Sequence, residues 1–529
     1  MYDVIIRGGM VIDGTGSPGR RLDVAIVGDK IASLGVNIRE TAKKTIAADG
    51  MVVAPGFIDT HSHSDLALLA NPHLEEKIRQ GVTTEILGQD GLGLAPVYTD
   101  EAKAVLQEHL RGLLGSPELA WDWSSFADYL KFYYRKGIVL NVGALVSHGA
   151  LRIAVMGMED RLATAEELEE MKGHLAAAME AGAMGMSTGL IYPPCNYGDS
   201  KELVELARVI AKYDGAFVVH VRNEADYLLE SQQEMIDLAS ASGVRLHISH
   251  LKTIGKKNWA KVGTSLATLE AARKAGLGIT ADQYPYLAGS TSLSACLPPW
   301  AMAGGPQVMA GRLRDPVERQ RIKDAFNQPI PNWQNRGETE GWENVIVASV
   351  GSGDPAVVGK SVATLAAERA QHPVDVIMDI ILAEENRATM VCFQNSEESL
   401  TQVMQKPWVM VATDGILGAG KPHPRLYGTF PRILGRYVRE ESVLTLEEAV
   451  RKMTGLPAAT FGLNDRGVLK EGLVADVVVF DPERVIDRAT YEEPKQWPEG
   501  IHYVLVNGEL VVAEGEALAA LPGRVLLHK

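Results

Sequence analysis

The sequence predicts an α/β fold: a (β/α)8 TIM-like barrel, a small β-sandwich domain built from both termini, and a small inserted subdomain. Short apolar strands alternate with amphipathic helices between about residues 56 and 455, which is the pattern of repeated βα units. Both ends of the chain are instead rich in strands. A segment rich in Pro, Gly and Trp, at about residues 288–344, interrupts the repeat.

The two ends are expected to form one β-sandwich domain from residues 1–54 and 456–529. YDVIIRGGMVIDG is interpreted as two short strands joined at Gly8 and Gly9, and RLDVAIVGDKIASLG repeats that pattern. At the other end, VADVVVFDPERVI and YVLVNGELVVAEGE also have the pattern of strands, and the second contains an Asn-Gly hairpin turn.

The barrel is expected over residues 55–455. Two of its helix starts are visible in the sequence, because Thr164 with Glu167 and Thr445 with Glu448 fit the S/T-x-x-E capping box. Nine segments are strand candidates: GFIDTH, TTEIL, IVLNVGALV, MGMSTGL, AFVVHVRN, RLHISH, GITADQYP, TMVCFQN and WVMVATDG. An eight-stranded barrel needs one fewer, so we expect one candidate to lie outside it.

The segment at about residues 288–344 has no βα repeat, although it includes the charged helical piece DPVERQRIKDAFN. A structureless loop of this length is improbable in a compact domain. We therefore expect a small subdomain inserted over the barrel mouth, where it could act as a lid.

The composition of the 529-residue chain excludes several classes of protein. A net charge of −15 and a pI near 5.4 argue against a nucleic-acid partner or an anionic membrane surface. No signal peptide or long apolar stretch predicts secretion or a membrane anchor. Cys195, Cys296 and Cys392 are too few and too far apart for a disulfide framework. We expect a cytoplasmic protein with a small-molecule partner, and homo-oligomer formation stays open.

Two histidines follow the apolar run in VVAPGFIDTHSHSDLALL. Side chains in an extended strand alternate between faces, so His61 and His63 project to the same side and can reach one metal ion. The alternative is that either ring is an ordinary polar side chain whose hydrogen bonds are satisfied. Their position at a strand end favours the ligand role, because barrel enzymes build their sites at the C-terminal ends of the strands.

Other predicted strands also end in side chains that are typical metal ligands. The set at these strand ends is His61, His63, Asp90, His148, His220, His250 and Asp414. The C-terminal ends of barrel strands share one surface, so these side chains are expected to converge. Imidazoles and carboxylates suit Zn²⁺, and also Mn²⁺, Fe²⁺ or Co²⁺. The sequence thus predicts a site for one or two divalent metal ions.

Longer motifs narrow the prediction. A strand ending in H-x-H, later strands ending in His and a last strand ending in Asp resemble the amidohydrolase superfamily. GLIYPP, HVRNE, HISHLK, DQYPYLAGST, VATDG, HPRLYGTFPRILGRYVRE and the tail from ADVVVFDPE to PGR resemble, within it, the D-aminoacylases, or N-acyl-D-amino-acid deacylases. The resemblance spans nearly the whole chain. It implies a metal-dependent enzyme that hydrolyses the amide bond of N-acyl-D-amino acids, releasing a carboxylic acid and a D-amino acid.

The resemblance also implies how the ligands are divided. A tighter metal position would be formed by Asp90, His220 and His250, and a second, weaker position by His61, His63 and Asp414. Asp414 would in addition take a proton from the attacking water and deliver it to the departing amine.

The sequence departs from the family at EILGQDGLGLAP. The resembling stretch of the D-aminoacylases reads G-N-C-G, with the cysteine as a metal ligand, and Asp90 stands in its place here. A carboxylate is a harder ligand than a thiolate, so we expect Asp90 to keep the role and to alter the metal preference. The alternative is that Asp90 only caps the following turn, as Asp before Gly often does.

Substrate binding is expected to involve Lys252, Tyr284, Ser290 and Tyr192. The substrate carries a carboxylate, and Lys252 is the candidate cation for it, with a solvated surface lysine as the alternative. Tyr284 and Ser290 in QYPYLAGS, and Tyr192 in IYPPCNYG near the acyl group, follow from the resemblance.

Four further side chains near the predicted site have catalytic or structural roles in this interpretation. His148 in LVSHGALR is a catalytic candidate that could polarise the amide carbonyl, or it could orient another residue of the site. Arg222 and Glu224 are interpreted as a structural ion pair. Cys195 is interpreted as a packing residue rather than a nucleophile.

Two other functions stay open. One is hydrolysis of a cyclic amide such as a hydantoin or a dihydropyrimidine. Relatives with that activity usually carry a carboxylated lysine, and no lysine ends the fourth predicted strand, MGMSTGL. The other is a non-catalytic assembly protein on the same fold, which would have no use for converging imidazoles.

Overall fold

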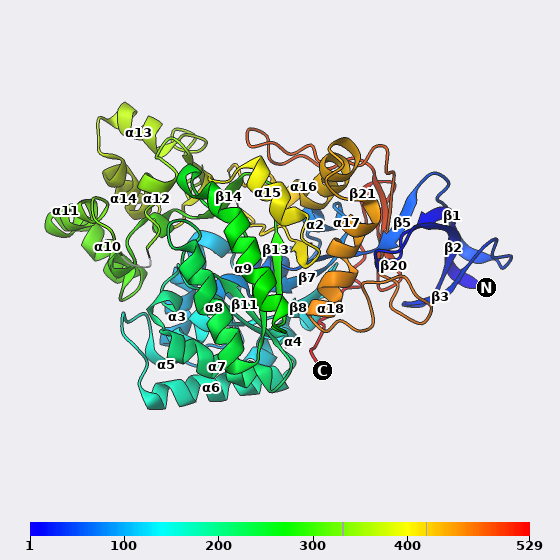
Figure 1. Cartoon of the computed structure of the whole chain (residues 1–529), viewed down its shortest axis with the longest axis horizontal. Helices are drawn as coiled ribbons and strands as arrows, with labels where there is room; N and C mark the ends of the chain where they lie inside the picture. The colour runs from blue at the N-terminus through cyan, green and yellow to red at the C-terminus, as the bar shows by residue number, and fades with distance from the viewer. Residues whose placement is uncertain (331–332, 419) are drawn as a thin grey trace.

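Three structural parts lie along the long axis of the molecule. The computed structural model describes residues 1–330, 333–418 and 420–529. Figure 1 shows the barrel in the middle, the strands of the N-terminus at one end of the long axis and the helices of the insert at the other. Among the described residues, no helix combines the length and apolar character needed to cross a lipid bilayer.

The middle of the chain is a barrel of parallel strands, as predicted. Its strands in chain order are β6 (Phe57–Asp59), β7 (Val82–Leu87), β8 (Asn141–Ala144) continued by β9 (Val146–Ser147), β10 (Gly185–Gly189), β11 (Ala216–His220), β12 (Arg245–Ile248), β13 (Ile279–Gln283) and β17 (Val409–Val411). Each neighbouring pair that forms a ladder is parallel. A parallel bridge between Ser62 and Gly415 joins the first strand to the last and closes the barrel.

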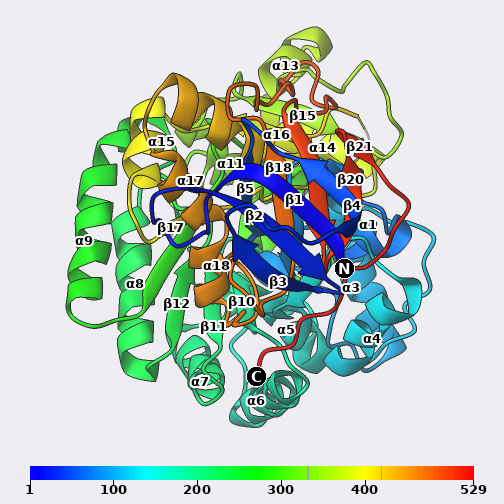
Figure 2. The same cartoon turned by 90° about the vertical axis from the view of Figure 1, so that its right-hand side faces the viewer.

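Helices surround the barrel strands, and most begin with a side-chain cap. They are α1 (Asp65–Ala70), α2 (Glu75–Ile78), α3 (Asp100–Leu114), α4 (Phe126–Lys136), α5 (His148–Met156), α6 (Ala165–Glu180), α7 (Ser200–Ala211), α8 (Leu228–Ser242), α9 (Val262–Lys274), α15 (Glu397–Met404), α16 (Arg425–Arg432), α17 (Leu446–Met453) and α18 (Gly455–Thr460). Figure 2 shows many of them around the periphery. The predicted capping box of Thr164 and Glu167 is present in full at α6, and Thr445 accepts the Glu448 N–H at α17.

Strands from both termini form one nine-stranded sheet. These strands are β1 (Tyr2–Val11), β2 (Arg20–Val27), β3 (Lys30–Gly35), β4 (Ala42–Ala47), β5 (Val52–Pro55), β18 (Val477–Phe480), β19 (Ile501–Val506), β20 (Glu509–Ala513) and β21 (Glu516–Ala517). The two ends meet where β5 pairs antiparallel with β18. Ile6, Val24, Val477 and Leu505 belong to one buried cluster, so the N-terminal and C-terminal strands share a core.

The turn predicted at Gly8 and Gly9 is wrong, because β1 runs through both residues as one strand. The pairing of β1 with β2 shifts register between Ile6 and Gly9, and Gly8 has a φ of 70°. A glycine with positive φ inside a strand is typical of a β-bulge, which bends the strand without ending it.

The insert is longer than predicted and contains its own sheet. Strands β14 (Ala288–Ser292), β16 (Thr389–Phe393) and β15 (Val345–Ser349) pair antiparallel in that order. The helices of the insert are α10 (Pro306–Arg314), α11 (Pro316–Ala325), α12 (Arg336–Thr339), α13 (Val362–Arg369) and α14 (Pro373–Ala383). TMVCFQN is therefore the strand candidate that lies outside the barrel. The sequence analysis ended the insert at about residue 344, which is too early. Strand β15 and helix α14 have the apolar pattern of a βα unit, but in the structure they pack into the separate core of the insert.

Candidate metal centre

The predicted ligands converge at the C-terminal ends of the barrel strands. His61 and His63 follow β6, Asp90 lies in the turn after β7, and His220 ends β11. His250 follows β12 and Asp414 follows β17. All six side chains are at least nine-tenths buried. The side chains that the sequence placed at strand ends thus meet in one enclosed space, apart from His148.

One carboxylate oxygen of Asp90 lies among four imidazoles. Asp90 Oδ2 is 3.5 Å from His61 Nε2, 3.7 Å from His63 Nε2, 3.6 Å from His220 Nδ1 and 3.7 Å from His250 Nε2. These separations are too long for good hydrogen bonds. They fit two ligand atoms that share a metal ion, because bonds of 2.0–2.2 Å at tetrahedral angles place the ligand atoms roughly 3.4 Å apart.

The backbone of the Asp90 turn is held in a left-handed conformation. Asp90 has a φ of 55°, and Gly88 and Gly91 on either side have φ values of 76° and 69°. The hydroxyl of Ser187 accepts the Gly91 N–H at 2.9 Å, and the hydroxyl of Ser147 donates to the Gly91 carbonyl. Asp90 Oδ1 has no hydrogen-bond partner among the described residues, so the alternative role of Asp90 as a turn cap finds no support here.

Asp414 also lies beside the His61 and His63 pair. Its Oδ1 lies 3.3 Å from His63 Nε2 and 3.7 Å from His61 Nε2, and its Oδ2 lies 3.0 Å from Arg425 Nη1. Burial alone would raise the pKa of Asp414, but the Arg425 guanidinium and the His61 ring hold it well below its usual value. The carboxylate is therefore ionised near neutral pH, as a metal ligand must be.

A divalent metal ion fits these residues. Buried polar groups in proteins are nearly always hydrogen-bonded. Within the described part of the chain, however, both ring nitrogens of His61, both of His220 and Asp90 Oδ1 have no such partner. Ligand atoms lie within 4.8 Å of one another in three groups: His61, Asp90 and His250; His61, His63 and Asp414; and His220, Glu224 and His250. The donor set of imidazoles and carboxylates suits zinc or a harder ion such as manganese.

Glu224 is a residue of the site that the sequence analysis missed. Its Oε1 lies 2.6 Å from Lys252 Nζ and 3.1 Å from His250 Nδ1, and its Oε2 lies 3.4 Å from His220 Nε2. The predicted ion pair with Arg222 is wrong, since Arg222 pairs with Glu234 at 3.1 Å. Side chains at i and i+2 of an extended segment share a face, so Glu224, four residues after His220 in HVRNE, is on the histidine's side.

The seam between the first and last barrel strands is held by a buried lysine. Lys77 Nζ lies 2.7 Å from both Asp59 Oδ2 and Glu85 Oε1, and it donates to the Thr413 hydroxyl at 2.8 Å. The Asp414 N–H donates to the His61 carbonyl at 2.8 Å across the same seam. This network fixes the strand ends that carry His61 and Asp414.

The four predicted substrate-binding residues line one cavity with the candidate ligands. Lys252, Tyr284, Ser290 and Tyr192 belong to the wall of a cavity of about 400 Å³ that also exposes His63, Asp90, His220, His250 and Asp414. Lys252 is buried rather than a solvated surface lysine. Burial lowers the pKa of Lys252, but the Glu224 carboxylate outweighs this effect and raises it above its usual value.

Arg336 is a second residue of this cavity that the sequence analysis missed. It comes from α12 of the insert, lines the cavity and pairs with Glu340 at 2.7 Å. Nothing local in the sequence around α12 indicates a site, because the arginine reaches the barrel mouth only through the fold of the insert.

His148 does not line this cavity, so the structure does not support its predicted catalytic role. Its Nδ1 is 2.8 Å from the Thr188 hydroxyl and its Nε2 is 2.8 Å from Glu202 Oε1, so neither ring nitrogen is free for an amide carbonyl. Arg152 pairs with the same Glu202 carboxylate. Cys195 is fully buried, with its Sγ against Gly91, which agrees with a packing role.

Comparisons with known proteins agree with this arrangement. A family model described as the amidohydrolase family matches residues 44–512. The chain is 35% identical over 525 residues to a D-aminoacylase of Alcaligenes xylosoxydans xylosoxydans, covering 99% of this chain and 97% of that protein. It is 37% identical over 524 residues to an N-acyl-D-glutamate deacylase of the same organism, covering 99% and 96%.

A solved relative has the same fold over its full length. The crystal structure of N-acyl-D-glutamate deacylase from Bordetella bronchiseptica, complexed with zinc and a phosphonate inhibitor that mimics the tetrahedral intermediate, matches with a TM-score of 0.84. The identity is 35%, and the match covers 99% of each chain. The protein therefore belongs to the amidohydrolase family.

Proposed function

We propose that this protein is a metal-dependent amidohydrolase that cleaves the amide bond of N-acyl-D-amino acids, releasing a carboxylic acid and a D-amino acid. The position of Asp90 Oδ2, 3.5–3.7 Å from nitrogens of four imidazoles, is the observation that carries the proposal. The named activities of the full-length relatives, D-aminoacylase and N-acyl-D-glutamate deacylase, support the substrate class.

Two groups of side chains would hold the metal. Asp90, His220 and His250 would form the tighter position, and His61, His63 and Asp414 a second one. A divalent ion supplies a nucleophile at neutral pH by lowering the pKa of water that it binds to about 7. Asp90 contributes an oxygen ligand, which favours harder ions such as manganese or cobalt more than a thiolate would.

Asp414 would move the proton during hydrolysis. The water oxygen forms a bond to the amide carbon, the C–N bond breaks, and the nitrogen needs a proton to leave as an amine. Asp414 accepts a proton from the attacking water and delivers it to that nitrogen. Its position among the candidate ligands, with Oδ1 3.3 Å from His63 Nε2, supports this role.

The carboxylate of the substrate would bind at the cationic wall of the cavity. Lys252 supplies the charge, and the hydroxyl groups of Tyr284 and Ser290 supply hydrogen-bond donors beside it. A charge-assisted contact of this kind orients the amide as well as binding the substrate.

A cytoplasmic location is also part of the proposal. Cys195, Cys296 and Cys392 are all buried and unpaired in the structure, which is typical of proteins from reducing compartments.

A hydrolysis screen tests the proposed function. Protein stripped with a chelator is reloaded separately with zinc, manganese and cobalt, and is offered N-acetyl amino acids in matched D and L series, together with a hydantoin and a dihydropyrimidine. Release of D-amino acids that depends on added metal supports the proposal. Equal rates on the D and L series, hydrolysis of the cyclic amides alone, or full activity without metal would each contradict it.

A further inference from the structure

The turn at residues 88–91 holds Asp90 in a backbone conformation that aspartate does not prefer. Asp90 has a φ of 55°, and the glycines on either side of it also have positive φ values. This left-handed region is unfavourable for residues other than glycine, because their Cβ approaches the backbone. Such a conformation persists only where the surrounding contacts hold it. Without those contacts Asp90 would relax to negative φ, and its carboxylate would move away from the imidazoles.

Two serines on neighbouring barrel strands bind this turn. Ser147 at the end of β9 and Ser187 in β10 lie directly opposite each other in the parallel ladder, and we call them the serine pair. The Ser187 hydroxyl donates to the Gly88 carbonyl and accepts the Gly91 N–H at 2.9 Å. The Ser147 hydroxyl donates to the Gly91 carbonyl. Ser187 therefore spans the turn from its first residue to its last.

The serine pair is held in place by the residue that follows each serine. Both serines are fully buried. His148 follows Ser147, Thr188 follows Ser187, and the His148 Nδ1 lies 2.8 Å from the Thr188 hydroxyl. This hydrogen bond links the ends of β9 and β10. His148 does not line the catalytic cavity, which is the one that the candidate ligands line, but it joins the two strands that carry the serine pair.

The first half of the turn has separate anchors. The Gly88 N–H donates to Asp65 Oδ1 at 3.0 Å, and Gln89 Nε2 donates to the Thr60 carbonyl at 2.7 Å. Asp65 and Thr60 both come from the segment after β6 that also carries the two histidines of the H-x-H motif. These contacts fix where the turn begins, whereas at Gly91 the turn is held by the serine pair.

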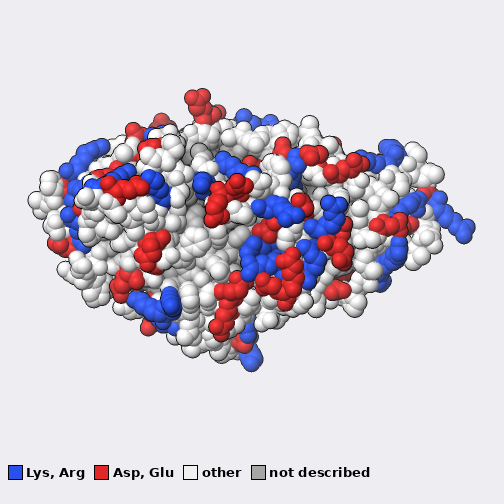
Figure 3. Space-filling model, turned by 90° about the horizontal axis from the view of Figure 1, so that it is seen from above, with Lys and Arg blue, Asp and Glu red and all other residues white. Residues whose placement is uncertain are grey.

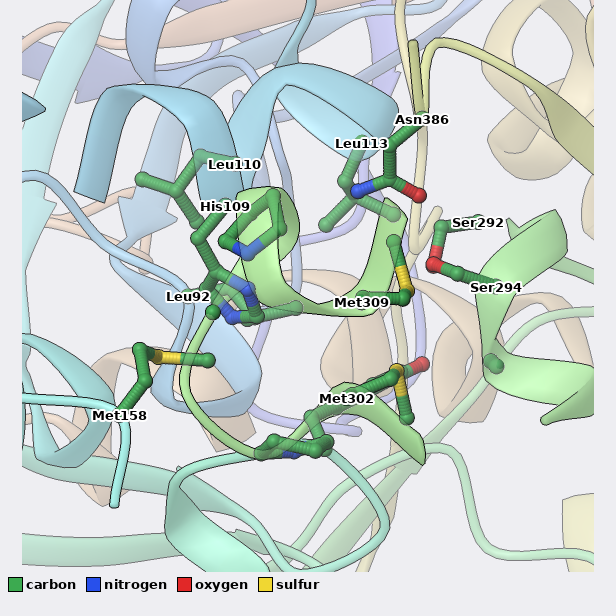
Figure 4. Close-up of a pocket in the computed structure, with 15 residues that line it drawn as sticks. Leu92, His109, Leu110, Leu113, Met158, Ser292, Ser294, Met302, Met309 and Asn386 are labelled. Carbon is green, nitrogen blue, oxygen red and sulfur yellow. The ribbon is translucent and has the colours of Figure 1, made fainter. Parts of the chain in front are cut away.

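The chain that leaves the turn borders a cavity. Leu92, directly after Gly91, lines a space of about 520 Å³ together with Leu110 of α3 and Met309 of α10 (Figure 4). A cavity wall offers fewer packing contacts than a close-packed core. The hydrogen bonds from β9 and β10 are therefore more important for the conformation of the Gly91 end.

We propose that Ser187, together with Ser147, positions Asp90 as a metal ligand and so determines the metal affinity of the site. The inference rests on the proposed function. Ser187 acts through the backbone, because its bonds to both ends of the turn keep Asp90 Oδ2 at 3.5–3.7 Å from nitrogens of four imidazoles. A ligand that is already in position binds a metal ion more tightly than one that must be ordered during binding.

Metal affinity tests the inference. Ser187→Ala removes the hydroxyl that spans the turn, and competition with a chromophoric chelator measures the dissociation constant for Zn²⁺. The affinity should fall about 10–100-fold, as is usual when a group that orients a ligand is lost. Ser265→Ala is the matched control, because Ser265 is buried in α9 and accepts a hydrogen bond from Gln232 of α8. Wild-type affinity in Ser187→Ala, or an equal loss in both variants, would overturn the inference.

The visible absorption spectrum of the cobalt-loaded protein provides a second readout, which a general loss of stability would not change. The spectrum of bound Co²⁺ depends on the number and the arrangement of its ligands. Ser187→Ala should shift this spectrum, because Asp90 leaves its position, and Ser265→Ala should keep the wild-type spectrum. An unshifted spectrum in Ser187→Ala would overturn the inference.

Ser147→Ala is the second variant and decides the question if Ser187→Ala fails to fold. It removes the donor to the Gly91 carbonyl and should also weaken zinc binding. Ser147 caps α5 by accepting the Ala150 N–H, so Ser125→Ala, which removes the serine cap of α4, is its control and should keep the wild-type affinity. Wild-type affinity in Ser147→Ala would exclude the serine pair from this role.

The outcomes separate the inference from the function on which it rests. If the wild type binds zinc and hydrolyses N-acyl-D-amino acids, and the variants of the serine pair bind zinc equally well, the inference fails and the proposed function stands. If the wild type binds no divalent metal ion, both fail.

Discussion

Lys252 Nζ lies 2.6 Å from Glu224 Oε1, and both side chains are buried in the wall of the catalytic cavity. The same carboxylate contacts His250 Nδ1. Glu224 therefore connects Lys252, which is proposed to bind the substrate carboxylate, to a candidate metal ligand. Removing one charge of a buried ion pair destabilises the protein, because the charge of the other partner stays buried without compensation.

Lys252→Met should raise the KM for N-acyl-D-amino acids on the order of a hundredfold, because the ammonium pairs with the substrate carboxylate. The KM for a neutral amide with the same acyl group should change far less. Steady-state kinetics on both substrates measure the difference. Lys257→Met is the control, since Lys257 is a half-exposed lysine with its own acidic partners. Equal effects of Lys252→Met on the charged and neutral substrates would remove Lys252 from this role.

Glu224→Gln should weaken metal binding by about 10–100-fold, because the carboxylate orients His220 and His250 through their outer ring nitrogens. Competition with a chromophoric chelator measures the dissociation constant. Glu234→Gln is the matched control, as Glu234 pairs with Arg222 and touches neither histidine. Wild-type affinity in Glu224→Gln would show that the orientation of these rings does not depend on it.

Asp414→Asn should lower kcat by a factor of about 10²–10⁴ and leave most of the metal bound, because the proton carrier is lost while Asp90, His220 and His250 remain. Rate measurements and elemental analysis on the same sample test both statements. Asp487→Asn is the control, since Asp487 forms a comparable buried ion pair, with Arg432 of α16. A variant of Asp414 that kept most of its kcat would exclude it as the proton carrier.

The buried Lys452 should make stability depend on pH. Burial lowers the pKa of Lys452 to about 7, whereas an unfolded chain keeps a lysine pKa near 10.4. Between about pH 7 and about pH 10 the unfolded state binds more protons, so the free energy of unfolding rises with pH, by at most about 5 kcal/mol from this residue. Lys452→Met should remove that part of the increase.

Urea unfolding at several pH values measures this contribution in both proteins. The exposed Lys470 provides the control, because Lys470→Met should keep the wild-type slope of free energy against pH. If the free energy of unfolding of Lys452→Met rose with pH as steeply as that of the wild type, Lys452 would not be the source of the pH dependence.

Much of the barrel and its ligands could be predicted from the sequence, because these features depend on local periodicity. The alternation of side chains in a strand places His61 and His63 on one side, and the shared C-terminal face of a barrel brings them to Asp90 and Asp414. The same reasoning failed for His148, because a strand-end position does not reveal that Thr188 and Glu202 take both of its ring nitrogens.

The rest depends on contacts between segments far apart in the chain. Arg336 reaches the cavity only because the insert folds over the barrel mouth. The strand Thr389–Phe393 has an ordinary buried-strand pattern, and only its antiparallel pairing with Ala288–Ser292 assigns it to the insert. The charge distribution is likewise a property of the folded surface, and Figure 3 shows acidic and basic side chains interspersed on the face in view.

The metal content of Asp90→Ala after dialysis tests the central claim most directly. Asp90 Oδ2 is the oxygen among the four imidazoles, so its removal should strip the metal from the purified protein. Asp315→Ala is the matched control, because Asp315 caps α11 and its loss should cost about 1 kcal/mol of stability without affecting metal. Elemental analysis should find metal in the wild type and in Asp315→Ala and none in Asp90→Ala, whereas a full metal complement in Asp90→Ala would contradict the account.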